Sequence, residues 1–410
     1  MRIKKNRGTR ALTLVMDVKK ICPKSKRSTR VCTRNQLNHF VSCKRSQVTI
    51  FIMLAIIIVA GIISFFVFRG GISIGGIPAS LEPAHNYFLT CLEEEALTGA
   101  SILGVQGGYI ELPEFEPGSP YAPTSSQLDF LGTGVPYWYY VSGNGIQKQQ
   151  IPSLNDMEIE LEDYIEKNIL DCSFDEFYEQ GYEIATEEPN AKVSIKGGEI
   201  VVDLNMDMAL RKNEDTALIK KHSVAVKSKL GDFYDSARKI YDSERNNNFL
   251  ENYGVDVLRL YAPVDGVELS CSPLTWIQEE VKKDLKNALE ANTRTIKVNG
   301  NYYELSSKEN KYFVVDAEKR ADDANVNFVY SSNWPTKIEI YPDDEVLIAE
   351  PVGNQPGLGV LGFCYVPYHF VYDLNYPVLI QIYNGQEMFQ FPVAVVIDKN
   401  KAIEGKIGEE

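Results

Sequence analysis

The chain has few of the residues, and none of the most specific short motifs, that often carry catalysis. Its 410 residues include four histidines and three tryptophans, and no H-E-x-x-H motif, P-loop or EF-hand loop occurs. The local signatures of zinc proteases, P-loop nucleotide-binding proteins and calcium-binding EF-hands are therefore missing. No N-x-[ST] sequon occurs either, so we do not expect N-glycosylation by the usual route. The sequence predicts no catalytic residue, metal ligand or cofactor, although a triad assembled in space would leave no local pattern.

Two glycine motifs match functional sequence patterns but lack the secondary structure that those patterns require. Gly71–Gly75 matches the hydrolase pattern G-x-S-x-G, but it lies in a short glycine-rich spacer and not at a turn between a strand and a helix. Gly357–Gly362 matches the dinucleotide pattern G-x-G-x-x-G, which requires a helix to begin at the third glycine. The residues that follow, Phe363–Phe370, are typical of a strand. We interpret the first motif as part of a linker and the second as a loop between strands.

Charge is missing from one long stretch of the chain. Val48–Phe68 is a run of 21 residues without Asp, Glu, Lys or Arg, and about 20 apolar residues in a helix cross a hydrocarbon core. Residues 1–47 carry 14 Lys or Arg against a single acid, Asp17, whereas the net charge of the whole chain is −14. This asymmetry predicts a single-pass membrane protein with a cytoplasmic N-terminus and an acidic C-terminal part outside. The lipid bilayer is thus an expected partner, and nucleic acid is not, because the acidic part repels phosphates.

The residues before this run resemble a processing site. Lys44-Arg45-Ser46-Gln47 precedes Val48–Phe51, and the arrangement resembles the class III signal sequences of archaeal type IV pilin-like precursors. In that family a basic cluster and a small residue precede the cut, so the resemblance implies cleavage between Ser46 and Gln47. The chain departs from the family at Phe51, where the family usually has Glu. More loosely, the whole chain resembles archaeal single-pass membrane proteins. Without cleavage, the run would remain as a signal anchor.

The seven cysteines fall into two sets. Cys22, Cys32 and Cys43 lie in residues 1–47, where thiols should stay reduced, and their spacing does not fit a zinc knuckle. The four cysteines after the run are an even number in an oxidising compartment, which predicts two disulfides with three connectivities open. They are Cys91, Cys172, Cys271 and Cys364. Pairing between neighbours would close loops of about 80 to 95 residues, and buried free thiols are the alternative.

The pattern of apolar and turn residues predicts an α+β ectodomain with antiparallel β hairpins and packed helices, preceded by one transmembrane helix. Helical spacing predicts helices over 82–104, 154–170, 232–246 and 273–291. Turn dipeptides predict hairpins at Asn144-Gly145, Gly197-Gly198, Asn299-Gly300 and Asn384-Gly385. The expected order is a basic cytoplasmic tail (1–47), a transmembrane helix (48–68), a flexible linker (69–80), a helix plus β-hairpin region (81–150) and two α+β units (151–265 and 266–410).

A short internal similarity suggests that the chain repeats a β unit. Val202-Asp203-Leu204-Asn205 is followed by Val224–Val226, and Tyr372-Asp373-Leu374-Asn375 is followed at similar spacing by Val393–Val395. Both stretches predict strand, turn and strand, with Asp and Asn on one side of the first strand and Leu on the other. A pair of like sites on these Asp and Asn residues is one interpretation. The exposed faces of half-buried strands are the other.

The remaining candidate residues each have a structural interpretation beside a functional one. The histidines after the run could act as bases beside an acid, the acid clusters could hold calcium, and the aromatic segments could stack on sugars. These residues are His85, His222 and His369; Asp322-Asp323 and Asp343–Glu345; and Tyr137–Tyr140 and Tyr365–Tyr372. We favour structural histidines, solvated loops and sheet core.

Without a coherent catalytic pattern, the sequence favours a non-enzymatic role and leaves an enzymatic one open. We expect a membrane-anchored extracytoplasmic surface protein with a structural or protein-interaction role, in contact with the bilayer and other envelope proteins. One alternative is a pilin-like filament subunit processed before Gln47. Another is a surface hydrolase, whose pocket would hold His222 or His369 beside a carboxylate or a serine.

Overall fold

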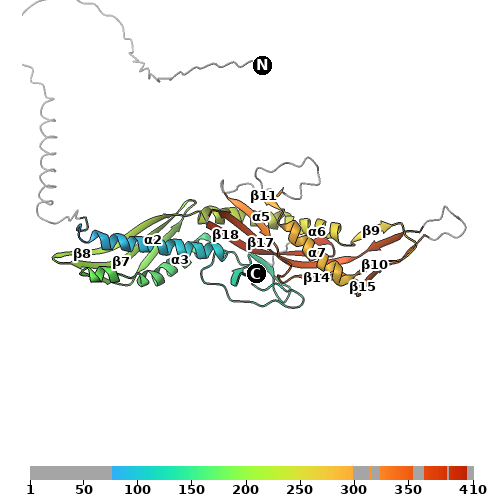
Figure 1. Cartoon of the computed structure of the whole chain (residues 1–410), viewed down its shortest axis with the longest axis horizontal. Coiled ribbons are helices and arrows are strands. Elements are labelled where there is room, and N and C mark those ends of the chain that lie inside the picture. The colour runs from blue at the N-terminus through green and yellow to red at the C-terminus, as the bar shows by residue number, and fades with distance from the viewer. Residues whose placement is uncertain (1–75, 299–313, 316–323, 354–363, 386, 404–410) are drawn as a thin grey trace, which may run out of the picture. The chain divides into compact units, whose positions relative to one another are not determined.

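The structure is a computed structural model that describes residues 76–298, 314–315, 324–353, 364–385 and 387–403 (Figure 1). All of these residues belong to one compact unit, Gly75–Glu410. The apolar run Val48–Phe68 and the predicted cleavage site between Ser46 and Gln47 lie outside the described residues.

The first of two large sheets is built around one long strand. Its strands are β5 (Tyr182–Thr186), β6 (Asn190–Ile195), β7 (Glu199–Lys212) and β8 (Asp215–Lys227). β8 pairs with β7 along one side, while β6 and β5 share the other side, opposite the first and second halves of β7. Every second residue of β7 from Ile200 to Leu210 is buried. This is the period-two pattern of a strand with one face in the core.

Two helices cover the buried face of this sheet. α2 (Glu82–Val105) packs against β8, and α3 (Leu154–Asn168) packs against β6 and α2. A capping box begins α3: the Ser153 hydroxyl accepts a hydrogen bond from the Asp156 N–H, and the Asp156 carboxylate accepts one from the Ser153 N–H.

The free edge of β6 is closed by a row of glutamates on α3. The carboxylates of Glu158, Glu162 and Glu166 accept hydrogen bonds at 2.7 to 2.9 Å from three alternate backbone N–H groups of β6. The two spacings match because four helical residues rise about 6 Å and two strand residues rise about 6.6 Å. An edge that would otherwise offer unpaired donors to another chain is thereby satisfied.

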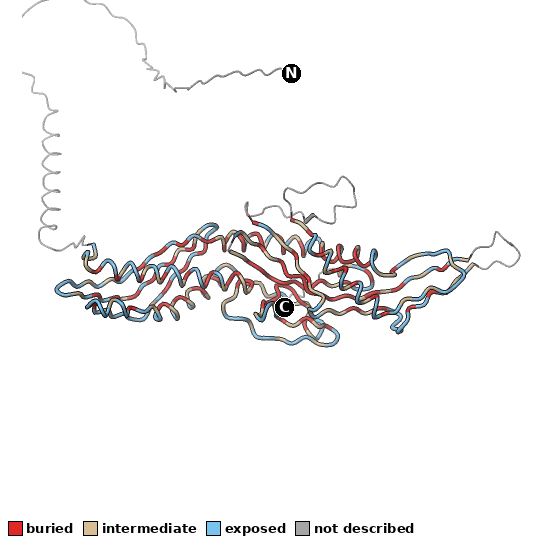
Figure 2. The backbone as a smooth tube through the Cα atoms, in the orientation of Figure 1, coloured by how far each residue is buried: buried red, intermediate tan, exposed pale blue. Residues whose placement is uncertain are grey.

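The second large sheet is built around a long antiparallel hairpin. Its strands are β3 (Tyr139–Val141), β4 (Gln147–Gln149), β13 (Asn325–Val329), β14 (Lys337–Tyr341), β17 (Val371–Asn384), β18 (Glu387–Asp398) and β19 (Lys401–Ala402). β17 pairs with β18 along one side, and β14 and β13 share its other side. β19 and β3 pair with β18, and β4 extends the sheet from β3. The middles of β17 and β18 are buried on both faces (Figure 2).

The two sheets share one strand arrangement, which confirms the predicted repeat of strand, turn and strand. In each, a long hairpin (β7–β8 or β17–β18) carries two shorter strands on the outer side of its first member. The similar sequences occupy corresponding places, because Asp203 lies opposite β6 and Asp373 lies opposite β14.

Three helices pack on or beside the second sheet. α5 (Leu230–Asn247) and α6 (Phe249–Tyr261) contact β18, and α7 (Gln278–Thr293) packs against α6. The end of α2 also reaches β18, where Gly104 approaches the Met388 carbonyl so closely that a Cβ would clash. Trp138 is fully buried there: its ring stacks on Phe391 at 4.0 Å and its Nε1–H donates to the Gly107 carbonyl. Through α2 the buried residues of both sheets form one continuous core.

The remaining elements are short, and two disulfides brace them. The antiparallel pairs are β1 (Gln127–Phe130) with β2 (Thr133–Pro136), β9 (Asp265–Glu268) with β16 (Val366–His369), and β10 (Leu274–Ile277) with β15 (Val346–Ala349); β11 (Lys297–Val298) pairs in parallel with β12 (Val314–Val315), and the short helices are η1 (Ile169–Asp171) and α4 (Asp175–Glu179). Cys91 of α2 is bonded to Cys172 after η1, and Cys271 before β10 is bonded to Cys364 before β16. The predicted disulfides are thus confirmed, with neighbours paired.

The predicted fold, an α+β domain preceded by one transmembrane helix, needs correction. Strands dominate the described residues, and none of the helices among them is long and apolar enough to span a bilayer. The longest, α2, has 24 residues but carries Glu82 and Glu93–Glu95.

The local predictions were right where turn and periodicity signals were strong. α2, α3 and α5 lie where helices were expected, and hairpins turn at Asn144-Gly145, Gly197-Gly198 and Gly385. The helix predicted from Pro273 is wrong at its start, because Leu274–Ile277 pairs with β15 as strand β10 and α7 begins only at Gln278. Asn299-Gly300 lies outside the described residues.

Candidate functional site

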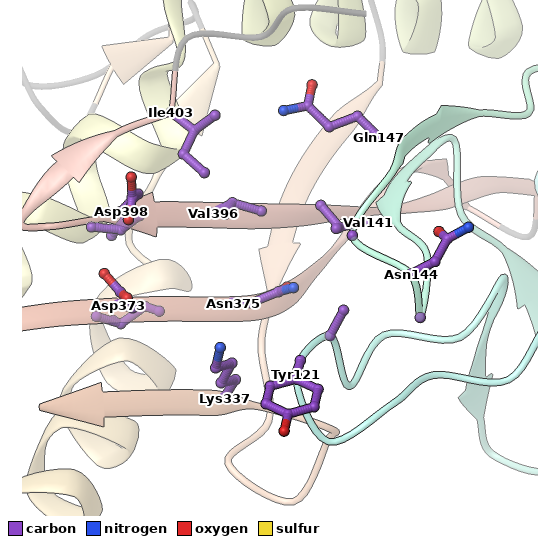
Figure 3. Close-up of a pocket in the computed structure, with 15 residues that line it drawn as sticks. Tyr121, Val141, Asn144, Gln147, Lys337, Asp373, Asn375, Val396, Asp398 and Ile403 are labelled. Carbon is purple, nitrogen blue, oxygen red and sulfur yellow. The ribbon is translucent and has the colours of Figure 1, made fainter. Parts of the chain in front are cut away.

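A pocket of about 560 Å³ lies on the face of the second sheet opposite α5 and α6 (Figure 3). We call it the sheet-face pocket. Its polar lining residues are Tyr121, Asn144, Gln147, Lys337, Asp373, Asn375 and Asp398. They come from β14, β17 and β18 on one side and from the β3–β4 hairpin and the segment around Tyr121 on the other. Tyr376 lies against Gly254 of α6, and its neighbour Asn375 points to the other face because side chains alternate along a strand.

The carboxylates of the pocket are positioned by the ends of β17 and β18. Asp373 comes just before Leu374 and Asp398 just after Ile397, and these two residues pair across β17 and β18, so the carboxylates lie on neighbouring strands. Asp373 accepts a hydrogen bond at 2.8 Å from the backbone N–H of Lys399. Lys399 and Asn400 adopt left-handed conformations, as a two-residue hairpin turn into β19 requires, and the Asn400 carboxamide bonds to the backbone of Tyr372. The turn therefore holds the Asp373 carboxylate against the sheet.

The β3–β4 hairpin supplies the opposite wall. Asn144 organises its loop by accepting hydrogen bonds from the Ser142 hydroxyl at 2.5 Å and from the Ile146 N–H at 3.3 Å. Gly145 follows with a positive φ of 81°, a conformation that glycine adopts without steric cost. Gln147 then begins β4 and lines the pocket.

Two amide oxygens in this pocket are buried without a hydrogen-bond partner. Asn375 is only 5% exposed, and neither its Oδ1 nor the Oε1 of Gln147 accepts a hydrogen bond. Leaving a buried acceptor unpaired costs about 1–3 kcal/mol, so such groups are uncommon in folded proteins. Both side chains belong to the lining of the same pocket, and the two oxygens themselves are closed off from solvent.

The charge of the pocket is negative on balance. Its one lysine, Lys337, is paired with Glu339, whose Oε2 lies 3.0 Å from the lysine Nζ. Within the described residues neither Asp373 nor Asp398 has an ion-pair partner. The two carboxylates are therefore available to a positively charged group.

The corresponding residues of the first sheet are exposed to solvent. Asp203 and Asn205 lie on the exposed face of β7, and Asp203 accepts a hydrogen bond at 2.7 Å from the hydroxyl of Ser223. The predicted pair of like sites therefore differs between the repeats: Asp373 and Asn375 line a pocket, whereas the other pair is solvated. The difference arises because the β3–β4 hairpin extends only the second sheet.

The predicted histidines lie elsewhere. His85 Nε2 and His222 Nδ1 are 3.2 Å apart, and His222 Nε2 is 3.0 Å from the Met206 carbonyl oxygen. Burial lowers the pKa of both histidines, and the neighbouring His222 lowers that of His85 further. His369 pairs with Asp265 across the exposed strands β16 and β9. No described histidine lines the pocket, so the arrangement expected of a hydrolase is not present there.

A buried carboxyl pair, which sequence reasoning missed, lies at the junction of α5 and α6. Glu244 and Glu251 are 1% and 2% exposed, and Glu244 accepts a hydrogen bond from the Leu250 N–H. Burial, together with the charge of Glu251 and a hydrogen bond to it, raises the pKa of Glu244 well above its usual value. The carboxyl group of Glu244 therefore keeps its proton to a higher pH than a solvated glutamate does. Its seven-residue spacing across a helix break leaves no sequence signal.

The other candidates are structural or lie outside the described residues. Tyr137–Tyr140 is buried in the core, as expected, and does not offer a face for sugars. No group of three or more His, Cys, Asp or Glu that could hold a metal occurs in the described part of the chain, which includes Asp343–Glu345. Three of the candidates fall outside it: Asp322-Asp323, Gly71–Gly75 and the whole of Gly357–Gly362.

Comparisons with protein-family models, with curated proteins and with solved structures found no match to this chain.

Proposed function

We propose that this chain is an extracytoplasmic surface protein, attached to the cell membrane by residues 48–68, with a structural or protein-interaction role. The observation that carries the proposal is the pairing of all four cysteines that follow this run in two disulfides. Disulfides persist in oxidising compartments and are rare in the cytosol. The basic residues 1–47 are the part that the proposal assigns to the cytoplasm.

A binding role is supported by the sheet-face pocket. Its walls are held by backbone hydrogen bonds and tight turns, so the pocket exists before any partner arrives. Among the described residues its two carboxylates have no ion-pair partner, so they are open to a positively charged group. Preformed concave sites with a few convergent polar groups are the usual form of a recognition site.

Counting free thiols in the native cell tests the compartment. A membrane-permeant maleimide added before lysis should label the three cysteines of residues 1–47 and none of the later four; all seven should react after denaturation and reduction. A variant with Ser at Cys22, Cys32 and Cys43 should then remain unlabelled until it is reduced. Labelling of Cys91 or Cys271 without reductant would contradict the proposal.

Protease treatment of intact cells tests the orientation independently. Protease outside the cells should degrade residues after 68 and leave an epitope placed before residue 44, while a cytoplasmic protein serves as the control for intact cells. Protection of the C-terminal part would refute the proposed location. Cleavage between Ser46 and Gln47 stays a prediction, and the mass of the N-terminal peptide of the purified protein decides it.

A further inference from the structure

The buried carboxyl pair Glu244–Glu251 joins two helices that follow one another along the second sheet (Figure 1). The Glu244 Oε2 accepts a hydrogen bond at 3.0 Å from the backbone N–H of Leu250, which lies in the first turn of α6. N–H groups in a first turn have no partner within their own helix. The Glu244 carboxyl is also hydrogen-bonded to the side chain of Glu251. Glu244 therefore connects the last turn of α5 to the first turn of α6.

The pair lies among titratable and charged side chains from every element packed against it. These are Tyr241 and Arg245 of α5, Tyr253 of α6, Tyr139 of β3, Tyr376 of β17 and Tyr330, which follows β13. Arg245 is the one cation among them, and its guanidinium carbon lies 3.8 Å from the centre of the Tyr139 ring. With a single proton on the two carboxyl groups, the positive charge of Arg245 balances the remaining negative charge. Loss of that proton leaves one uncompensated negative charge in the core.

The fold provides little else to stabilise two ionised carboxylates at this place. The Oε2 of Glu251 is buried without a hydrogen-bond partner, and so is the Nε of Arg245. In the part of the chain that the structure describes, neither glutamate forms an ion pair. Two buried carboxylates in contact repel each other strongly, because little water is present to screen their charges. The hydrogen bond between them therefore depends on a shared proton.

The helix that begins at this pair is bounded by a break in helical conformation at each end. Asn248 before α6 is left-handed, and Ala262 after the 13-residue helix is extended. The chain is fixed again soon afterwards, because the Val264 carbonyl accepts a hydrogen bond at 2.8 Å from the Phe370 N–H. α6 thus has the boundaries of a segment that can open as a unit while the sheet beneath it stays folded.

We propose that the Glu244–Glu251 pair is a proton-controlled latch, which keeps α6 on the second sheet as long as the two carboxyl groups share a proton. When the pH rises, the proton passes to water, the carboxylates repel each other, and α6 separates from α5 and the sheet. The closed state holds one proton more than the open state. The equilibrium constant for opening therefore rises by up to about tenfold per pH unit, between the pKa of a solvated glutamate and the raised pKa of Glu244.

Hydrogen exchange, followed by mass spectrometry on the purified full-length protein, tests the latch. After correction for intrinsic exchange rates, peptides from α6 should be at least about tenfold less protected at pH 8 than at pH 6. At pH 8 they should also be at least about tenfold less protected than peptides from β7 in the first sheet. Equal protection of α6 at the two pH values would overturn the inference. Equal protection of α6 and β7 at pH 8 would do so too, because α6 would then exchange only when the whole protein unfolds.

Two glutamine variants assign the effect to the pair. Glu244→Gln mimics the protonated pair, since its amide oxygen accepts from the Leu250 N–H and its amide N–H donates to Glu251. Glu251→Gln leaves one carboxylate without a charged neighbour to repel. In both variants α6 should be equally protected at pH 6 and pH 8. Loss of protection that persists in either variant would overturn the inference.

The matched control is Asp235→Asn, which removes an exposed carboxyl group from α5 and should keep the loss of protection seen in the parent. The measurement on the parent decides by itself if a variant does not fold. The latch does not depend on where the protein lies in the cell. The thiol and protease tests therefore succeed or fail separately from this one.

Discussion

Removing the disulfide between Cys91 and Cys172 should cost the protein much of its stability. The bond joins α2 to the residue after η1 across a sequence separation of 81 residues. A cross-link over a loop of that length reduces the entropy of the unfolded chain by an amount worth about 4.5 kcal/mol at 25 °C. Folded proteins are stable by only about 5–15 kcal/mol, so the loss is a large fraction of the total.

The assay is urea unfolding of a variant with Ala at both Cys91 and Cys172, followed by tryptophan fluorescence. The variant with Ala at Cys271 and Cys364 should lose about as much, about 4.6 kcal/mol for a separation of 93, because the entropy depends only weakly on loop length. The control is the same comparison under reducing conditions, where the parent also lacks the disulfides. The difference in unfolding free energy between each variant and the parent should then nearly vanish. If either variant loses less than about 1 kcal/mol of unfolding free energy relative to the oxidised parent, the reasoning from chain entropy is refuted.

Three further predictions concern the core. The pKa of Glu244 is raised in the folded protein, so its contribution to stability is complete below the unfolded pKa and is lost as pH rises through the folded pKa. The urea midpoint should therefore decline between pH 5 and pH 9. The variant Glu251→Gln should show a smaller decline over the same range. The pKa values of His85 and His222 are lowered in the folded protein, so stability should fall as pH drops below about 6.5. The variant His85→Gln should show a smaller drop in Tm between pH 7.5 and pH 5.5 than the parent protein. An unchanged drop in Tm would contradict the pairing of the two histidines. Trp138→Ala should lower the free energy of unfolding by about 3–5 kcal/mol, and a loss under 1 kcal/mol would show that its stacking and hydrogen bond contribute little.

The sequence predicted local structure well where the signal is carried by neighbouring residues. The stripe of apolar residues in α3 and the turn at Asn144-Gly145 depend on backbone geometry within a few residues. The start predicted for α7 was wrong because Leu274–Ile277 is held as a strand by β15, a partner about 70 residues away. The sequence did not predict α6, because the polar residues at the end of α5 indicate only the end of a helix. Asn248 turns the chain in a left-handed conformation there, and α6 starts at the next residue.

The residues of the sheet-face pocket were likewise predictable from the sequence only in part. The similarity between Val202–Asn205 and Tyr372–Asn375 singled out Asp373 and Asn375 from sequence, and their placement on one face follows from strand periodicity. Nothing local distinguished them from Asp203 and Asn205. The distinction depends on the β3–β4 hairpin, which the fold brings from more than 220 residues earlier in the chain.

By itself, the sequence determined the helical stripes, the turn dipeptides, the repeated β unit and the even number of cysteines after the apolar run, because each depends on spacing along the chain. Only the tertiary structure decided which cysteines pair, which of the two repeats forms a pocket, and that two carboxyl groups meet in the core. These features arise from contacts between residues far apart in sequence, and their energies depend on burial and on partners that no local pattern specifies.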